Sequence, residues 1–248
     1  MPKNRSRVDE LGRAFAGSQL QIQIYVNRRE EELYQAVLNA LPSLASLSPR
    51  VHWVSPLESK KFIEYKDAEF LRAVGLAHLS PKLKELWPLR GPNWDALAAV
   101  EIDKSPGGRG VVLVEAKSHP SEIYGGGCQA SSPASLSMIE TALQQTKRWL
   151  GVAAYADWTG PLYQSANRLA HLYFLHKVVG VQAWLVNVYF INDPYSPTTL
   201  QDWSIALKHV KKELGLTGLL VPNTAELFLE GKDRIELIGQ TDRSLEGT

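Results

Sequence analysis

The sequence predicts an α/β fold in which helices cover both faces of a mixed central sheet that carries an antiparallel hairpin. Three observations lead to this class. Residues 91–119 contain two apolar runs joined by a turn rich in Gly and Pro, which is a hairpin pattern. Residues 181–191 are apolar on both faces, as expected for the middle of a sheet. Helical spacing of apolar residues recurs before, between and after these strands.

Length and composition are those of a single globular domain spanning 1–248. The chain is 44% hydrophobic and 21% charged, and no repeat or linker divides it. A formal net charge of +1 excludes a strong global basic field, so any nucleic-acid surface must be local. Cys128 is the one cysteine, which excludes an intramolecular disulfide or a cysteine zinc site and fits a cytoplasmic location. We expect neither a signal peptide nor a membrane span.

Hydrophobic periodicity predicts the elements that precede the hairpin. Residues 1–17 are polar and are expected to be loosely ordered. The stretch 20–26 alternates apolar and polar residues, which predicts a strand. The other elements expected here are a helix over 28–41, a short strand at 51–54, a helix over 60–76 and a short helix opened by Ser80-Pro81.

The same reasoning covers the chain beyond the hairpin. A glycine-rich loop at 125–133 leads to a helix over 135–150, for which Gly151 is the expected C-terminal cap. The further elements expected are a helix over 161–176, the strand at 181–191, a helix over 199–214, and short strands at 219–221, 227–229 and 235–238.

The hairpin carries the residues that point to chemistry. Glu115 and Lys117 end its second strand on one face, and charges at the end of an apolar strand must be paired or bind a metal. Asp95 opens the first strand, and it joins them if the register pairs it with Glu115 or Lys117. Asp95, Glu115 and the carbonyl oxygen of Ala116 would then offer a partial shell for Mg²⁺ or Mn²⁺.

Position distinguishes this Glu-x-Lys from others in the chain. The pattern also occurs at 58–60, 64–66 and 230–232, but no apolar strand leads into those copies. The alternative is structural: Glu115 and Lys117 end a strand and simply reach solvent.

At these residues the sequence resembles the PD-(D/E)XK nuclease superfamily, whose restriction-endonuclease-like core is a helix, a three-stranded antiparallel meander, a helix and a further strand. Asp95 matches the first acidic position, and Glu115 with Lys117 match the second motif. The match covers roughly residues 60–192. Trp94 stands where the family has proline before the acidic residue.

The resemblance leaves two assignments open. The first strand of the meander is either 51–54 or the short piece at 87–90. Many members carry a glutamate on the first core helix that joins the catalytic set, and Glu69 is the first choice here, with Glu64 as the other.

Basic and polar side chains supply candidate contacts to nucleic acid. Four cations are plausible phosphate ligands or else ordinary solvated charges: Lys104, Arg109, Lys147 and Arg148. The polar cluster of Tyr163, Gln164, Asn167 and Arg168 at the start of a helix faces either nucleic acid or solvent.

These expectations combine into one function with two alternatives. The resemblance implies a magnesium- or manganese-dependent nuclease that hydrolyses phosphodiester bonds, in DNA more often than in RNA. Asp95 and Glu115 would hold the metal, and Lys117 would position the attacking water. A catalytically silent member that binds nucleic acid or a partner protein is the first alternative, and an unrelated α/β scaffold is the second. The oligomeric state is left open, with a dimer among the options.

Overall fold

The computed structural model describes residues 7–102 and 108–239, which form an α/β fold around one mixed sheet. The strands lie in sequence order across this sheet. They are β1 (Pro49–Ser55), β2 (Ala96–Ile102), β3 (Arg109–Lys117), β4 (Gln182–Ile191) and β5 (Thr224–Glu230). The first three run antiparallel, whereas β4 is parallel to β3 and β5 is parallel to β4. The α/β class and the antiparallel hairpin are therefore confirmed.

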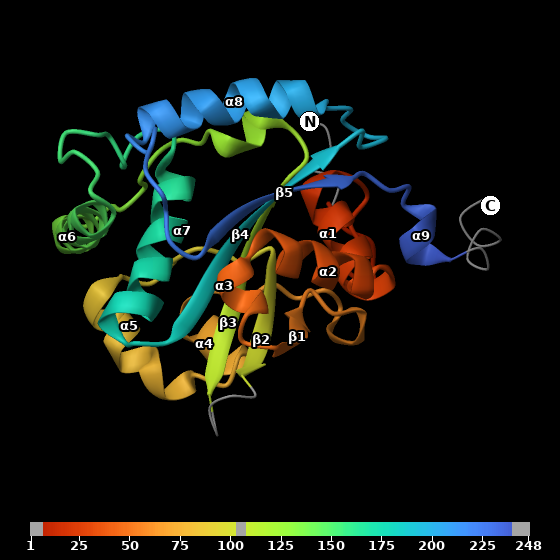
Figure 1. Ribbon diagram of the computed structural model, residues 1–248, viewed down its shortest axis with the longest axis horizontal. Helices are drawn as coiled ribbons and strands as arrows, with labels where there is room; N and C mark the ends of the chain where they lie inside the picture. The colour runs from red at the N-terminus through yellow and green to blue at the C-terminus, as the bar shows by residue number, and fades with distance from the viewer. Residues whose placement is uncertain (1–6, 103–107, 240–248) are drawn as a thin grey trace.

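Helices cover both faces of the sheet (Figure 1). One face is covered by α1 (Gly17–Arg28), α2 (Glu30–Ala40) and α3 (Pro42–Ala45). The other is covered by α4 (Asp67–Ala73), α5 (Ser80–Leu86), α6 (Pro133–Leu150), α7 (Tyr163–Tyr173), which continues as a π-helix over Phe174–Val178, and α8 (Leu200–Glu213). The short helix α9 (Ile235–Ile238) lies near the end of the described chain. Short 3₁₀ turns occupy Glu58–Lys60, Ala77–Leu79 and Pro120–Ile123.

Strand alternation divides the core into two layers. In β3 the side chains of Val111 and Leu113 pack under α4–α8, whereas Val112 and Val114 pack under α1–α3. All four are fully buried. Because both faces are covered, any charged side chain near the end of β3 enters a region that apolar helices already shield from water.

The segment 20–26 is a helix, not the predicted strand. It belongs to α1, and both its apolar and its polar side chains are buried. Gln21 exchanges hydrogen bonds with the backbone of Lys232, and Gln23 bonds the backbone of Gly12 and Ala14. An alternating pattern indicates a strand only if the polar residues face solvent, and here both glutamines serve as internal backbone partners.

Three other expected elements differ from the structure. The helix expected over 60–76 is reduced to α4, because Lys61 and Phe62 have positive φ angles (53° and 56°), which interrupt an α-helix. The segment 235–238 is helical, and 219–221 lies outside any strand. In the part of 1–17 that is described, Val8 pairs with Ala14 and Asp9 lies 2.7 Å from Arg13.

The remaining helices follow their sequence signals. Helix α6 ends at Gly151, whose φ of 72° is the left-handed cap conformation. Helix α8 opens on a capping box in which Thr199 and Asp202 each bond the other's backbone N–H. Within the described residues, no helix is long and apolar enough to cross a membrane.

Candidate functional site

The register of the hairpin brings Asp95 and Glu115 together. Ala96 pairs with Val114 and Leu97 with Leu113, so the same register continued by one residue sets Asp95 opposite Glu115. Leu97 and Leu113 both pack in the layer under α4–α8, which is therefore also the side of Asp95 and Glu115. The sequence required this register for a joint site, and the structure has it.

Glu115 is held between two cations. Its Oε1 lies 2.6 Å from Lys117 Nζ, and its Oε2 lies 2.5 Å from Arg168 Nη2 and accepts a second hydrogen bond from Arg168 Nε at 2.6 Å. The Glu115 side chain is only 9% exposed. A guanidinium that contacts one oxygen through two nitrogens, and an ammonium at the other oxygen, thus compensate one carboxylate that has little access to water.

Arg168 reaches this position from α7 and uses all three of its nitrogens there. Its Nη1 donates to Asn167 Oδ1 at 2.8 Å and its Nη2 to the carbonyl oxygen of Asn93 at 2.9 Å. The guanidinium also lies over the ring of Trp94, 5.1 Å from its centroid. Arg168 therefore ties α7 to the segment that enters β2 as well as to the end of β3.

Asp95 takes part through the backbone of the second strand. Its Oδ2 accepts a hydrogen bond from the N–H of Ala116 at 2.7 Å. Among the described contacts no cation pairs with Asp95, whereas two pair with Glu115. The two carboxyl groups are thus neighbours with opposite surroundings.

Glu64 is the third carboxyl group of the site. It lies between the 3₁₀ turn Glu58–Lys60 and α4, and it accepts hydrogen bonds from the side chains of Gln19 and Asn93. Burial, and repulsion from Glu115, raise the pKa of Glu64 to about 6. Asn93, which bonds Glu64, also accepts from Arg168 through its carbonyl, so Glu64 belongs to the same cluster.

Charge imbalance sets the protonation of the cluster. Burial, together with the negative charge of Glu115, holds the pKa of Asp95 well above its ordinary value. Burial alone would also raise the pKa of Glu115, but Arg168 and Lys117 hold it below its ordinary value. Burial would lower the pKa of Lys117, but Glu115 and Asp95 raise it. Three carboxyl groups thus share two cations.

The donor set suits a hard divalent cation in part. Asp95, Glu115 and the Ala116 carbonyl offer oxygen ligands. Burial and then repulsion from Glu115 raise the pKa of Asp95, and a bound cation would relieve that repulsion. Both oxygens of Glu115, however, already face Lys117 or Arg168. No group of three His, Cys, Asp or Glu residues within the described chain is arranged as a metal cage. A metal at this site would take few protein ligands, and Glu115 would have to give up part of its pairing with Arg168.

The other residues singled out from the sequence lie apart from this cluster. Glu69 is exposed on α4, and no hydrogen bond or ion pair of the described chain joins it to the site, so the structure brings in the alternative, Glu64. Lys147 is buried, and its Nζ donates to the carbonyls of Ala154 and Ala156, so its assignment as a displayed phosphate contact is corrected.

Neither Arg109 nor Arg148 makes a described contact with the carboxyl cluster. Arg109 begins β3, about 20 Å from Glu115 at the other end of that strand. Arg148 is exposed in the last turn of α6. Lys104 lies outside the described residues.

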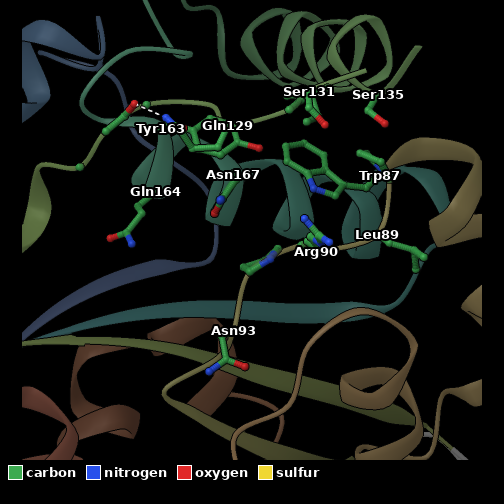
Figure 2. Close-up of a pocket in the computed structure, with 18 of the residues that line it drawn as sticks. Trp87, Leu89, Arg90, Asn93, Gln129, Ser131, Ser135, Tyr163, Gln164 and Asn167 are labelled. Carbon is green, nitrogen blue, oxygen red and sulfur yellow. Dashed lines mark hydrogen bonds between the residues drawn. The ribbon is translucent and has the colours of Figure 1, made fainter. Parts of the chain in front are cut away.

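A cleft of about 810 Å³ adjoins the carboxyl cluster (Figure 2). Asn93 and Arg168 line it and also contact Glu64 and Glu115. Its other walls come from residues 87–92, from the loop at 125–132 and from the start of α7. The polar residues predicted at the start of α7 therefore have different places. Tyr163 and Gln164 line the cleft, whereas Arg168 lies between the cleft and the carboxylates.

Sequence reasoning left the role of Arg168 undecided and did not select Asn93 or Gln19. One signal was available for Arg168: a buried Glu115 has two oxygens to satisfy, and Lys117 contacts only one of them. Asn93 and Gln19 give no such signal, because exposed amides of this kind are common and only the fold brings both to Glu64.

Comparisons with known proteins identify no relative. No protein-family model matches the chain, and neither curated proteins nor solved structures give a significant match.

Proposed function

We propose that this protein is a metal-dependent nuclease that hydrolyses phosphodiester bonds, in DNA rather than RNA. The observation that carries the proposal is the meeting of Asp95, Glu115 and Lys117 where β2 begins and β3 ends, with Glu64 beside them. Of the four Glu-x-Lys copies, this is the one whose lysine and glutamate are both largely shielded from water, at 13% and 9% exposure.

The order of the elements supports a restriction-endonuclease-like core. An antiparallel meander of β1, β2 and β3 is followed by α6 and α7, and then by β4 parallel to β3. The first strand of the meander corresponds to β1, one of the two candidates from the sequence. The acidic residue then precedes the second strand, and Glu115 and Lys117 end the third.

Each residue has a role in this proposal. Asp95, Glu115 and the Ala116 carbonyl would hold Mg²⁺ or Mn²⁺, which when bound would polarise the phosphate and activate water. Lys117 carries a positive charge at neutral pH, so it stabilises negative charge that develops on the phosphate and orients the attacking water. Arg168 keeps Glu115 ionised and fixes its side chain.

Cleavage assays test the proposal. Plasmid and single-stranded DNA are incubated with Mg²⁺, Mn²⁺ or chelator, using the wild type, Lys117→Met and Asp95→Asn. Loss of a positioned charge or ligand typically costs 10²-fold or more, so both variants should lower the rate at least about 100-fold. Lys60→Met is the matched control, because Lys60 ends another Glu-x-Lys and is exposed. Cleavage that persists in chelator, or equally in Lys117→Met, would contradict the proposal.

A second function is favoured by the pairing of Glu115 with Arg168. If that pair is permanent, the site is neutralised from within, and the chain is a catalytically silent nuclease-like protein that binds DNA or a partner protein. DNA binding without cleavage at any metal concentration, unchanged in Lys117→Met, would select this alternative.

A further inference from the structure

The cleft beside the carboxyl cluster has a chemistry of its own. Among the described residues that line it there is no carboxylate, and the charged side chains are Arg90 and Arg168. Most of the remaining polar groups are neutral amides and hydroxyls, contributed by Asn93, Gln129, Ser131, Ser132, Ser135, Gln164 and Asn167. Such a lining suits a ligand that is uncharged where it is recognised and anionic at one end. It does not suit a metal ion, which needs oxygen anions.

Aromatic rings form part of the wall. Tyr163 is half-buried and stacks on Trp87, with ring centroids 6.4 Å apart and planes at 22°. The phenol ring therefore has a supported position beside the cleft. Aromatic side chains of this kind stack on unpaired nucleobases, and amides and hydroxyls bond the base edges that pairing would otherwise occupy.

Position links the cleft to the carboxylates. Asn93 lines the cleft and donates to Glu64, and its carbonyl accepts from Arg168, which binds Glu115. One residue thus separates the cleft from the cluster. Figure 2 shows Ser131 and Ser135 at one side of the cleft and Arg90 and Asn93 at the other. Arg90 is exposed, holds a positive φ of 71° and makes no ion pair among the described residues, so its guanidinium is available to a phosphate.

Size is compatible with one nucleotide. A volume of about 810 Å³ falls within the usual range for small-ligand sites, about 300–1,000 Å³. A base inside a duplex could enter only after unpairing and unstacking, which costs a few kcal/mol, whereas an unpaired base pays far less.

From these observations we infer that the cleft binds one unpaired nucleobase of a single-stranded DNA substrate, beside the phosphodiester that the carboxyl cluster would cleave. The inference rests on the proposed nuclease function and narrows its substrate to single-stranded or frayed DNA. Tyr163 stacks on the base, the neutral polar groups meet its edge, and Arg90 contacts a flanking phosphate.

Binding is measured without turnover, by fluorescence anisotropy in chelator, with a labelled oligothymidylate of about 12 nucleotides and the matching duplex. We expect the single strand to bind at least about tenfold more tightly than the duplex. Stacking contributes about 5- to 150-fold per base, so Tyr163→Leu should weaken single-strand binding at least about fivefold. Tyr163→Phe, which keeps the ring, should stay within about twofold.

A second variant tests the cleft without removing a half-buried side chain. Ser131 is exposed at the cleft, so Ser131→Trp fills the space without disturbing the core and should weaken binding at least about fivefold. Ser204→Trp, on the exposed side of α8, is the matched control. Equal affinity for single strand and duplex, or unchanged binding in Ser131→Trp, would overturn the inference. Thymidine monophosphate binding as tightly as the oligonucleotide would overturn it too, since the ligand would then be a free nucleotide.

The binding and cleavage measurements distinguish this inference from the nuclease proposal. Single-strand binding that depends on Ser131 and Tyr163 supports the cleft even if no metal supports cleavage, in which case the nuclease proposal fails alone. Cleavage that depends on Lys117 but is indifferent to the cleft variants overturns the cleft and leaves the nuclease proposal standing.

Discussion

At the scale of single residues, the site is governed by an unequal sharing of charge. Glu115 has two cationic partners, whereas Asp95 has a backbone N–H and Glu64 has two amides. The consequence is a carboxylate that stays ionised beside two that hold protons more strongly than usual. This asymmetry gives predictions for stability that do not depend on activity.

Removing Arg168 should destabilise the fold through Glu115. Breaking a buried ion pair by deleting one partner typically costs about 3–5 kcal/mol, so Arg168→Met should lower the free energy of unfolding by about that amount. Urea unfolding measures it. The double variant Arg168→Met/Glu115→Gln removes both charges and should cost less than the sum of the two single changes. Strictly additive losses would show that the pair is not coupled.

The raised pKa of Glu64 predicts a pH dependence of stability. The folded protein binds this proton more tightly than the unfolded chain, so stability falls as pH rises from about 4.5, the ordinary value, to about 6. The loss is about 1–2 kcal/mol once solvent screening is allowed for. Glu64→Gln should flatten the profile in that window, as followed by urea unfolding at successive pH values.

Glu69 provides the control for this pH effect. It is an exposed glutamate on α4 that makes no hydrogen bond or ion pair with the described site. Glu69→Gln should therefore keep the wild-type slope between pH 4.5 and 6. A profile that stays steep in Glu64→Gln would mean that another group, such as Asp95, dominates the titration in this window.

At the scale of elements, the position of the site depends on how closely β3 approaches β4. A Cβ added at Gly110 would lie 2.8 Å from the Trp184 ring and 2.9 Å from the carbonyl oxygen of Gln182. Gly110→Ala should therefore cost about 1–3 kcal/mol by overpacking, as measured by urea unfolding. Gly125→Ala is the control, since nothing lies within 4 Å of its added Cβ, and it should stay within about 0.5 kcal/mol.

Elements with continuous apolar runs or strong end signals could be predicted from the sequence. The hairpin strands β2 and β3 follow from their apolar runs, and α6 from its helical spacing and Gly151. The helix α1 could not be predicted, because Gln21 and Gln23 are buried and mimic the exposed half of a strand. Similarly, α9 is a single short turn whose apolar residues satisfy a strand pattern equally well.

The residues of the candidate site also fall into a predictable and an unpredictable group. Glu115 and Lys117 are two residues apart on one strand, so strand alternation alone places them on the same face. Asp95 lies beside them because of the strand register, which a single hairpin turn can set. Glu64, Asn93 and Arg168 come from three separate segments. The bridge between Tyr65 and Trp94 and the packing of α7 against the sheet bring these segments together. Local pattern predicts the first group, and tertiary structure alone decides the second.

At the scale of the whole molecule, the excess negative charge of the cluster should make a divalent cation a stabilising ligand. A cation that binds only the folded state at about 100 times its Kd adds about 2.7 kcal/mol to the free energy of unfolding. For a chain of 248 residues this corresponds to a rise in Tm of about 5–10 °C. Thermal unfolding in Mg²⁺ or Mn²⁺, against chelator at matched ionic strength, measures the shift.

Asp95→Asn makes this thermal test specific. Asp95 has no cationic partner among the described contacts and lies opposite Glu115, so its negative charge is the one that a metal held by both residues would neutralise. The variant should lose most of the rise in Tm while its stability in chelator stays equal or increases, because a repelled buried charge has been removed. Glu69→Gln, at an exposed position of α4, should keep the full rise in Tm. An equal rise in Tm in Asp95→Asn would show that the cation binds elsewhere. No rise in the wild type would indicate that Arg168 and Lys117 already neutralise the site, as a catalytically silent protein requires.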